Sequence, residues 1–252
     1  MKKLILGLVG LMAALVLMPM FAAFEAHVVN VTATIENALQ VHPQSIRFGT
    51  VFPQEHLFSD FFIAFSQSFS TTDQLRVGTV EYVIKQKPMP KPERVAALGG
   101  KEAARDWCHA NAPVNPGDVN DPYYVNCYPS ICPYVSKHPD NIPGTGQPNR
   151  PPGPSDNNDV GLPPFHNPET DFAYGKIVKF INPNNTIGSD TSDNWTVDLA
   201  VPCFKGQCAQ DWPAFVRRLN PNATNTEIYK LPQGLEHQVF GCDLWVEVTD
   251  IY

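Results

Sequence analysis

Basic residues are scarce in this chain of 252 residues, which has 18 lysines and arginines against 25 aspartates and glutamates and a formal net charge of −7. Because phosphate backbones are bound by clustered lysine and arginine side chains, this balance argues against nucleic acid as a partner. No second long apolar run follows residue 24. The sequence therefore predicts contact with a membrane only through its first segment, and only if that segment is not cleaved.

Catalytic motifs are missing as well. The chain contains no G-x-S-x-G, no H-E-x-x-H, no P-loop and no dinucleotide fingerprint. Glu236-His237 could serve acid–base chemistry, but a lone histidine beside a glutamate is usually an ordinary surface pair. We therefore expect a protein that is not an enzyme and needs no cofactor.

The first 23 residues have the pattern of a secretory signal. Lys2 and Lys3 precede an apolar run from Leu4 to Met18 that contains no charge. An uncleaved membrane anchor is the alternative, but Pro19 interrupts the segment and such signals are usually removed. We expect residues 1–23 to be a signal peptide and the protein to be secreted, extracellular or on the cell surface.

Export would place the cysteines in an oxidising compartment, where an even number of them is most simply explained by disulfides. The sequence does not choose among the possible pairings. Cys203 and Cys208 could close a small loop, or Cys242 could pair with one of them. The disulfide candidates are Cys108, Cys127, Cys132, Cys203, Cys208 and Cys242.

A zinc site is the alternative use of the cysteines in the middle of the chain. Cys108-His109, Cys127, Cys132 and His138 offer soft ligands within a short segment. Their spacing does not match the close pairs of zinc modules, and export favours disulfides, so we expect no metal.

Alternation of apolar and polar residues predicts a mainly β protein. Val29, Val31, Ala33 and Ile35 are apolar at every second position, which is typical of a strand with one buried and one solvated face. No helical periodicity separates the first predicted strands, so they imply an antiparallel β-sandwich. The other predicted strands lie near residues 46–48, 57–69, 79–84, 173–181, 195–203 and 244–248, and one short helix is predicted at residues 208–219 with Pro213 in its first turn.

Regular patterns stop between residues 87 and 172. Most of the 25 prolines lie in this interval, and each disfavours helix in the residue before it. A helical stretch from Arg94 to Trp107 is broken by Gly99-Gly100, and residues 144–162 offer almost nothing to a core. We predict a single β-sandwich domain, residues 24–252, in which residues 87–172 form a Pro-rich insertion that depends on its disulfides.

Pro43, Ile46, Phe48, Gly49 and Val51 form a pattern of a proline, an apolar-x-Phe-Gly strand and a short turn. This pattern resembles the first strands of the immunoglobulin-like domains called ASH or choice-of-anchor domains. The resemblance implies an immunoglobulin-like or jelly-roll β-sandwich.

The lysine-started signal, the Ala-Phe-Glu that follows it, the alternating strand Val29 to Ile35 and the Asn37-Ala38-Leu39 turn form a second pattern. It is similar to the start of the TasA and camelysin group of exported matrix-fibre proteins. Members are β-sandwich subunits, and several polymerise when the N-terminal strand of one subunit completes the sheet of the next. The resemblance implies self-association.

We therefore expect a non-catalytic exported structural protein, with a biofilm-matrix or cell-surface fibre subunit as the first hypothesis. Its donor strand would carry Val29, Val31, Ala33 and Ile35, and its partner would be another copy of the chain. An ordinary first strand that closes its own sandwich is the alternative. In that case the chain would be a monomeric secreted binding or adhesion module that presents the insertion to another surface protein.

Overall fold

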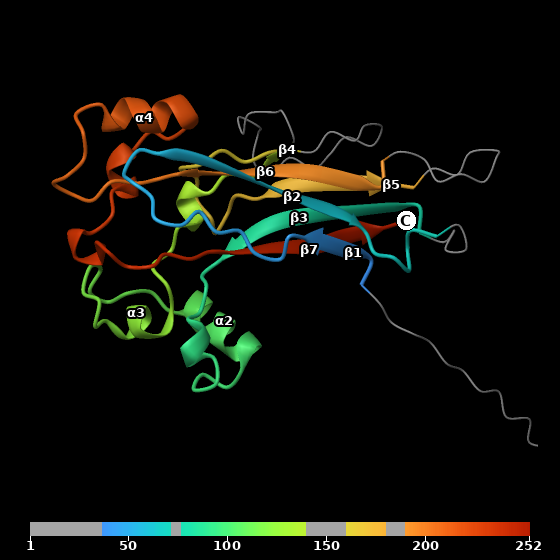
Figure 1. The fold of residues 1–252 in the computed structure, drawn as a ribbon, viewed down its shortest axis with the longest axis horizontal. Helices are drawn as coiled ribbons and strands as arrows, with labels where there is room; N and C mark the ends of the chain where they lie inside the picture. Colours follow the sequence, from blue (N-terminus) through green and yellow to red (C-terminus); the bar gives the residue numbers. More distant parts are fainter. Residues whose placement is uncertain (1–36, 72–76, 140–159, 180–189) are drawn as a thin grey trace, which may run out of the picture. The chain divides into compact units, whose positions relative to one another are not determined.

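Two antiparallel sheets dominate the computed structural model of this protein (Figure 1), which describes residues 37–71, 77–139, 160–179 and 190–252. Residues 37–252 belong to one compact unit. The expected strand Val29–Ile35 and the expected signal peptide lie outside the described residues.

The first sheet has four strands in the order β1-β2-β6-β4. Its centre is formed by β2 (His56–Phe65) and β6 (Ser192–Ala200), which pair along nine residues of each strand. The short strands β1 (Leu39–His42) and β4 (His138–Pro139) lie at its two edges. This sheet therefore joins the start of the described chain to its insertion and to its C-terminal half.

The second sheet has three strands in the order β5-β3-β7. The central strand β3 (Thr79–Lys87) pairs with β5 (Ala173–Val178) on one side and with β7 (Asp243–Ile251) on the other. The predicted strands near residues 79–84, 173–181 and 244–248 correspond to these three elements.

Side chains from the inner faces of both sheets meet in one hydrophobic core. On β2, alternate residues Phe61, Ile63 and Phe65 are buried, as the period-two pattern predicts. Tyr82 of β3 and Trp195 of β6 reach the same core from opposite sheets. Two packed sheets around a shared core are consistent with the expected β-sandwich.

Helices are more numerous than the sequence predicted. Three α-helices occur in the described ranges instead of the one expected: α2 (Lys101–Ala110), α3 (Pro122–Asn126) and α4 (Trp212–Leu219). The prediction of α4 is confirmed, with Pro213 in its first turn. The predicted break at Gly99-Gly100 is confirmed: a 3-10 helix ends at Arg94, both glycines have positive φ, and α2 begins directly after them. Short 3-10 helices span Pro92–Arg94, Cys132–Tyr134, Thr226–Tyr229 and Gln233–Leu235.

Two strand predictions were wrong in detail. No strand forms at residues 46–48; Ile46 and Phe48 pack against the core without sheet pairing, and the strand lies earlier, at β1. Apolar residues lie on both faces of the predicted strand 57–69, which predicts that both faces are covered, yet Phe58 and Phe62 of β2 point to the outer face and are 62% and 36% exposed. An apolar run thus did not distinguish a buried strand from one with exposed aromatic residues.

The end of the insertion contributes to the sandwich rather than lying apart from it. The backbone of Leu162 pairs with that of Lys137, immediately before β4, and Val160 pairs with Tyr174 of β5. Leu162 is completely buried in the core. The expectation that residues 144–162 hold nothing useful to a core was therefore wrong at its C-terminal end, and residues 144–159 lie outside the described part.

A polar network lies inside this core. The Tyr82 hydroxyl donates a hydrogen bond to Oδ2 of Asp193 and accepts one from the Trp195 indole at 2.8 Å. Burial raises the pKa of Asp193 to about 7, although the hydrogen bond from Tyr82 works in the opposite direction. The carboxyl group thus prefers to keep its proton in the folded protein.

We expect Asp193→Asn to flatten the dependence of the unfolding free energy on pH. Between pH 3.8 and about pH 7, the folded protein holds a proton on Asp193 that the unfolded chain releases. The contribution of this carboxyl group to the unfolding free energy therefore falls as the pH rises. Asparagine stays neutral and can still accept from Tyr82. From about pH 5 to pH 8, the unfolding free energy of the variant should rise relative to that of the wild type by on the order of 2 kcal/mol. Urea unfolding at both pH values measures this difference. The exposed Asp106→Asn variant is the control, and equal changes in both variants would contradict this assignment.

Candidate functional site

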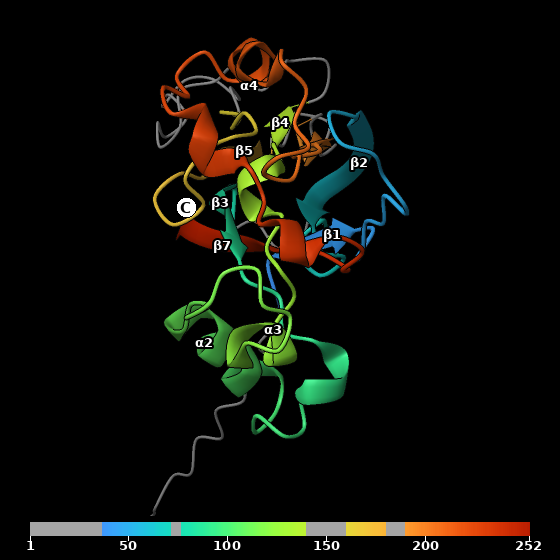
Figure 2. The same cartoon turned by 90° about the vertical axis from the view of Figure 1, so that its left-hand side faces the viewer.

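One side of the sandwich is closed by backbone pairing and the other is open. Residues 160–162 join the two sheets on the side of β4 and β5. On the opposite side, β1 pairs only with β2 and β7 only with β3 among the described residues. Figure 2 shows β4 and β5 together toward the upper side and β1 and β7 toward the lower side. In the described part of the chain, the open side therefore presents two strand edges without a pairing partner.

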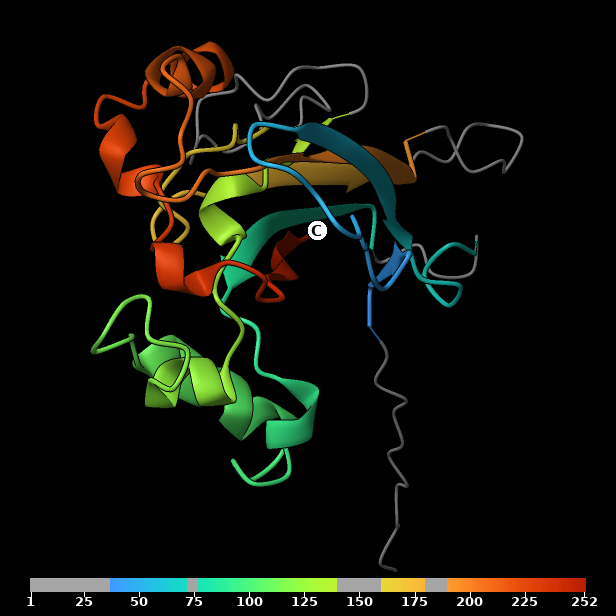
Figure 3. The same ribbon diagram turned by 60° about the vertical axis from the view of Figure 1, so that its left-hand side comes forward.

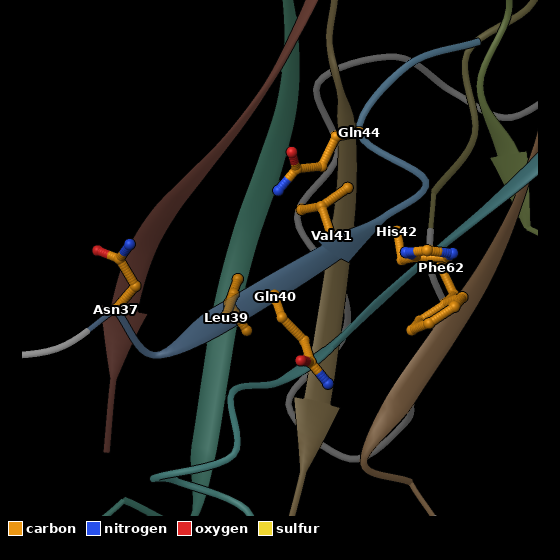
Figure 4. A pocket seen from close by; sticks show the side chains of 7 residues that line it. All are labelled: Asn37, Leu39, Gln40, Val41, His42, Gln44 and Phe62. Atoms are coloured by element: carbon orange, nitrogen blue, oxygen red, sulfur yellow. The ribbon is translucent and has the colours of Figure 1, made fainter.

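The open edge of β1 lies in a groove of about 560 Å³ (Figure 4). Side chains from both faces of the strand line it, because the groove follows the edge and not one face. Leu39 and Val41 pack against the core, while Gln40 and His42 are exposed. The other lining residues are Asn37, Gln44 and Phe62.

The second edge, β7, is longer and acidic. Its nine residues include Asp243, Glu247 and Asp250. By contrast, residues 27–35 contain no lysine, arginine, aspartate or glutamate. A strand from the N-terminal segment would thus meet this edge without charge repulsion, whereas two β7 strands paired about their centres would place Glu247 opposite its own copy.

All six cysteines form disulfides, as the sequence predicted. The pairs are Cys108–Cys127, Cys132–Cys242 and Cys203–Cys208. Of the two open alternatives at the C-terminal cysteines, the small loop between Cys203 and Cys208 is therefore correct. The zinc alternative needed thiolates at Cys108, Cys127 and Cys132, and these sulfur atoms are already paired. Three disulfides fit an oxidising environment.

The start of the insertion has a small core of its own. The disulfide between Cys108 of α2 and Cys127, directly after α3, packs with Tyr123, Tyr124 and Leu235. The two helices project from the sandwich in two views (Figures 1 and 3). This part of the chain therefore offers a separate, disulfide-supported surface.

Contacts with the beginning of β7 hold the insertion in place. Cys132 is bonded to Cys242, one residue before the strand. The guanidinium of Arg105 donates to the Asp243 carboxylate at 3.1 Å and also lies 5.2 Å from the centre of the Trp245 ring. A disulfide, an ion pair and a cation–π contact thus join the insertion to the beginning of β7.

A buried carboxylate joins three strands on the outer face of the first sheet. Asp198 of β6 accepts a hydrogen bond from Nε2 of His56 on β2, and its other oxygen lies 3.4 Å from Nε2 of His138 on β4. Burial alone would raise the pKa of Asp198, but the hydrogen bonds and charges of His138 and His56 lower it. Asp198 therefore stays ionised and acts as a polar connection within the sheet.

Lys137 is a buried amine on the inner side of the same region. Its side chain is completely buried, and its Nζ atom has no hydrogen-bond partner among the residues that the structure describes. Burial lowers its pKa well below the usual value, although the charges of Asp171 and Asp198 raise it in part. No sequence pattern marked Lys137, Asp193 or Asp198, because burial of a polar side chain depends on the assembled sheets.

The other sequence candidates give no catalytic arrangement. His237 is exposed and lies 4.0 Å from Glu236, as an ordinary surface pair. Within residues 37–71, 77–139, 160–179 and 190–252, no three His, Cys, Asp or Glu side chains are arranged to hold a metal ion. None of the helices in these ranges is long and apolar enough to cross a membrane.

The chain matches no family model, no curated protein and no solved structure.

The two disulfides that involve the C-terminal half should differ in their effect on stability. Replacing Cys132 and Cys242 by serine frees a loop with a separation of 110 residues, whereas the Cys203–Cys208 pair spans only 5. The chain-entropy estimate gives about 4–5 kcal/mol for the first pair and about 2 kcal/mol for the second. Urea unfolding of both double variants tests this order, and an equal or reversed loss would contradict it.

We expect Lys137→Met to stabilise the protein, most strongly at acidic and neutral pH. Below its usual pKa of 10.5, the Lys137 amine is protonated in the unfolded chain, whereas burial opposes its protonation in the folded protein. This difference lowers the unfolding free energy, and the loss disappears as the pH rises toward 10.5. Thermal unfolding at about pH 6 and pH 10 measures the change, with the exposed Lys101→Met variant as control. A loss of stability at both pH values would show that the amine has a favourable role.

Proposed function

We propose that this protein is an exported, non-catalytic structural subunit that assembles through its N-terminal strand into a fibre at the cell surface or in an extracellular matrix. The observation that carries the proposal is the open side of the sandwich, where the edges of β1 and β7 have no partner among residues 37–71, 77–139, 160–179 and 190–252. The chain enters this side at Asn37, directly after the alternating residues Val29, Val31, Ala33 and Ile35. Pairing that strand with the edge of a neighbouring copy would satisfy its backbone groups and repeat from copy to copy.

We extend the proposal to the type of sandwich and to the family. The two antiparallel sheets support an immunoglobulin-like or jelly-roll class. The similarity of the N-terminal segment supports membership in the TasA and camelysin group. The three disulfides support export, because such bonds persist in oxidising compartments.

A specific observation favours a second function. The helices α2 and α3 project from the sandwich with their own disulfide and their own small core. A monomeric binding or adhesion module could present this surface to a partner at another cell surface. In that case the strand Val29–Ile35 would pair within its own chain.

Trimming the N-terminal segment separates the two functions. We expect the chain that begins at Phe24 to form large or fibrous species, and the chain that begins at Asn37 to remain monomeric and folded, because β1 is left intact. Light scattering and electron microscopy measure assembly, and circular dichroism checks folding. If the longer chain is monomeric and trimming lowers its stability, the strand belongs to its own sandwich and the binding module is favoured.

Point variants test the face of the strand that is used. Val31→Asp with Ile35→Asp should abolish assembly, because both positions belong to the apolar set of the alternating pattern. Thr32→Asp with Thr34→Asp adds the same charge to the other face and should assemble normally. A synthetic peptide of residues 26–36 should bind the chain that begins at Asn37, and a scrambled peptide should not. Equal loss in both variants would contradict a donated strand with a buried face.

A further inference from the structure

The outer face of the first sheet carries a regular grid of side chains, of which only a part borders the groove at the β1 edge. Register places His42 of β1, Phe62 of β2 and Asn194 of β6 in one row across the sheet. The next row contains Asp60 and Thr196, and the row after it contains Phe58. On β1, β2 and β6, the outer face therefore presents aromatic rings and small polar groups side by side.

Aromatic rings stand out on this face. Phe58 is 62% exposed and Phe62 is 36% exposed, although both lie in a central strand. Each has an imidazole beside it: the ring centres of His42 and Phe62 are 5.4 Å apart, and those of His56 and Phe58 are 4.6 Å apart. Figure 4 shows the His42 and Phe62 rings lying next to each other. The two phenylalanines are four positions apart along β2, which corresponds to about 13 Å along the strand.

A hollow of about 210 Å³ lies beside Phe62 and is bordered by polar groups. Asp60, Asn194 and Thr196 contribute to its lining. Thr196 donates to one oxygen of Asp60 at 2.8 Å, which leaves the other oxygen able to accept. The Asn194 and Gln40 amides make no hydrogen bond with the described residues and can each donate and accept.

The charge of this face limits what can bind to it. The outward residues of β1, β2 and β6 include no lysine or arginine. The outer face of the second sheet is different, since its charges are paired with one another, as in Lys85–Glu247 at 2.9 Å and Lys176–Glu81 at 3.5 Å. Because it has no lysine or arginine, and because the imidazoles of His56 and His138 contact Asp198, the first face is poorly suited to a phosphate, a sulfate or an acidic polymer.

We propose that this face binds an uncharged polysaccharide. Pyranose rings have an apolar C–H face and a rim of hydroxyl groups, so they suit exposed aromatic rings flanked by carboxylate and amide groups. Sugar rings stack on Phe62 and Phe58. Their hydroxyl groups hydrogen-bond with Asp60 and Asn194 in the hollow. The site shares His42 and Phe62 with the groove at the β1 edge, whereas Phe58, Asp60, Asn194 and Thr196 of the same face lie outside that groove.

Affinity electrophoresis tests the proposal. The probes are the neutral polymers hydroxyethyl cellulose, galactomannan and dextran, with polygalacturonate as the acidic comparison. The protein is the chain that begins at Phe24, with Val31→Asp and Ile35→Asp to limit assembly, and it is produced without glycosylation because Asn194 begins an Asn-Trp-Thr sequon. We expect at least one neutral polymer to retard the protein and polygalacturonate to leave it unaffected.

Variants of the two phenylalanines show whether the face is responsible. Phe58→Ala with Phe62→Ala should weaken retardation at least tenfold, and Asn194→Ala should weaken it to a smaller extent. Ile228→Ala removes an exposed apolar side chain from a 3-10 helix elsewhere and should change nothing. Circular dichroism verifies that each variant is folded.

Three results would overturn the proposal. One is the absence of retardation by every neutral polymer, and another is unchanged retardation of the double phenylalanine variant. The third is a loss of assembly by that variant, in a background with the native N-terminal strand, without any binding of neutral polymers. That last result would assign the face to contacts between copies and would leave the proposed function intact.

Discussion

Backbone groups at the edge of a sheet need hydrogen-bond partners, and this requirement organises the whole structure. On one side of the sandwich, residues 160–162 supply partners to both sheets at once. On the other side, the edges of β1 and β7 have none among the described residues. The proposed function therefore rests on the N-terminal segment, which precedes β1 and could pair with such an edge, and not on a pocket.

The aromatic core of the sandwich also contains polar groups. Tyr82 and Trp195 bring a hydroxyl and an indole into the centre, and Asp193 completes their hydrogen bonds. Gly175, opposite Tyr82 across the sheet, leaves room for the phenol ring, since a Cβ atom there would lie 2.1 Å from it. The Lys137 amine, by contrast, has no hydrogen-bond partner in the described part of the chain, and the charges of Asp171 and Asp198 only partly offset its burial.

Both disulfides and strand pairing attach the insertion to the sandwich. Cys132–Cys242 joins it to the beginning of β7, and Cys108–Cys127 supports the helices that project from it. After the 3-10 helix Cys132–Tyr134, Val135 bridges to Leu199 of β6, and His138–Pro139 form β4 of the first sheet. An insertion held in this way can present a surface without weakening the sandwich, while the outer face of the first sheet remains accessible beside β1.

The sequence by itself determined the β class, the positions of most long strands, a helix within residues 208–219 and the use of all six cysteines in disulfides. Alternation, helical spacing and cysteine parity are local or compositional properties. Tertiary structure alone decided the pairing of Cys132 with Cys242, across 110 residues. It also decided that Phe58 and Phe62 are exposed, and that Lys137 and Asp193 are buried. The physical reason is common to all of these: burial and long-range pairing depend on which element covers which face, and a pattern along one strand carries no information about its neighbours.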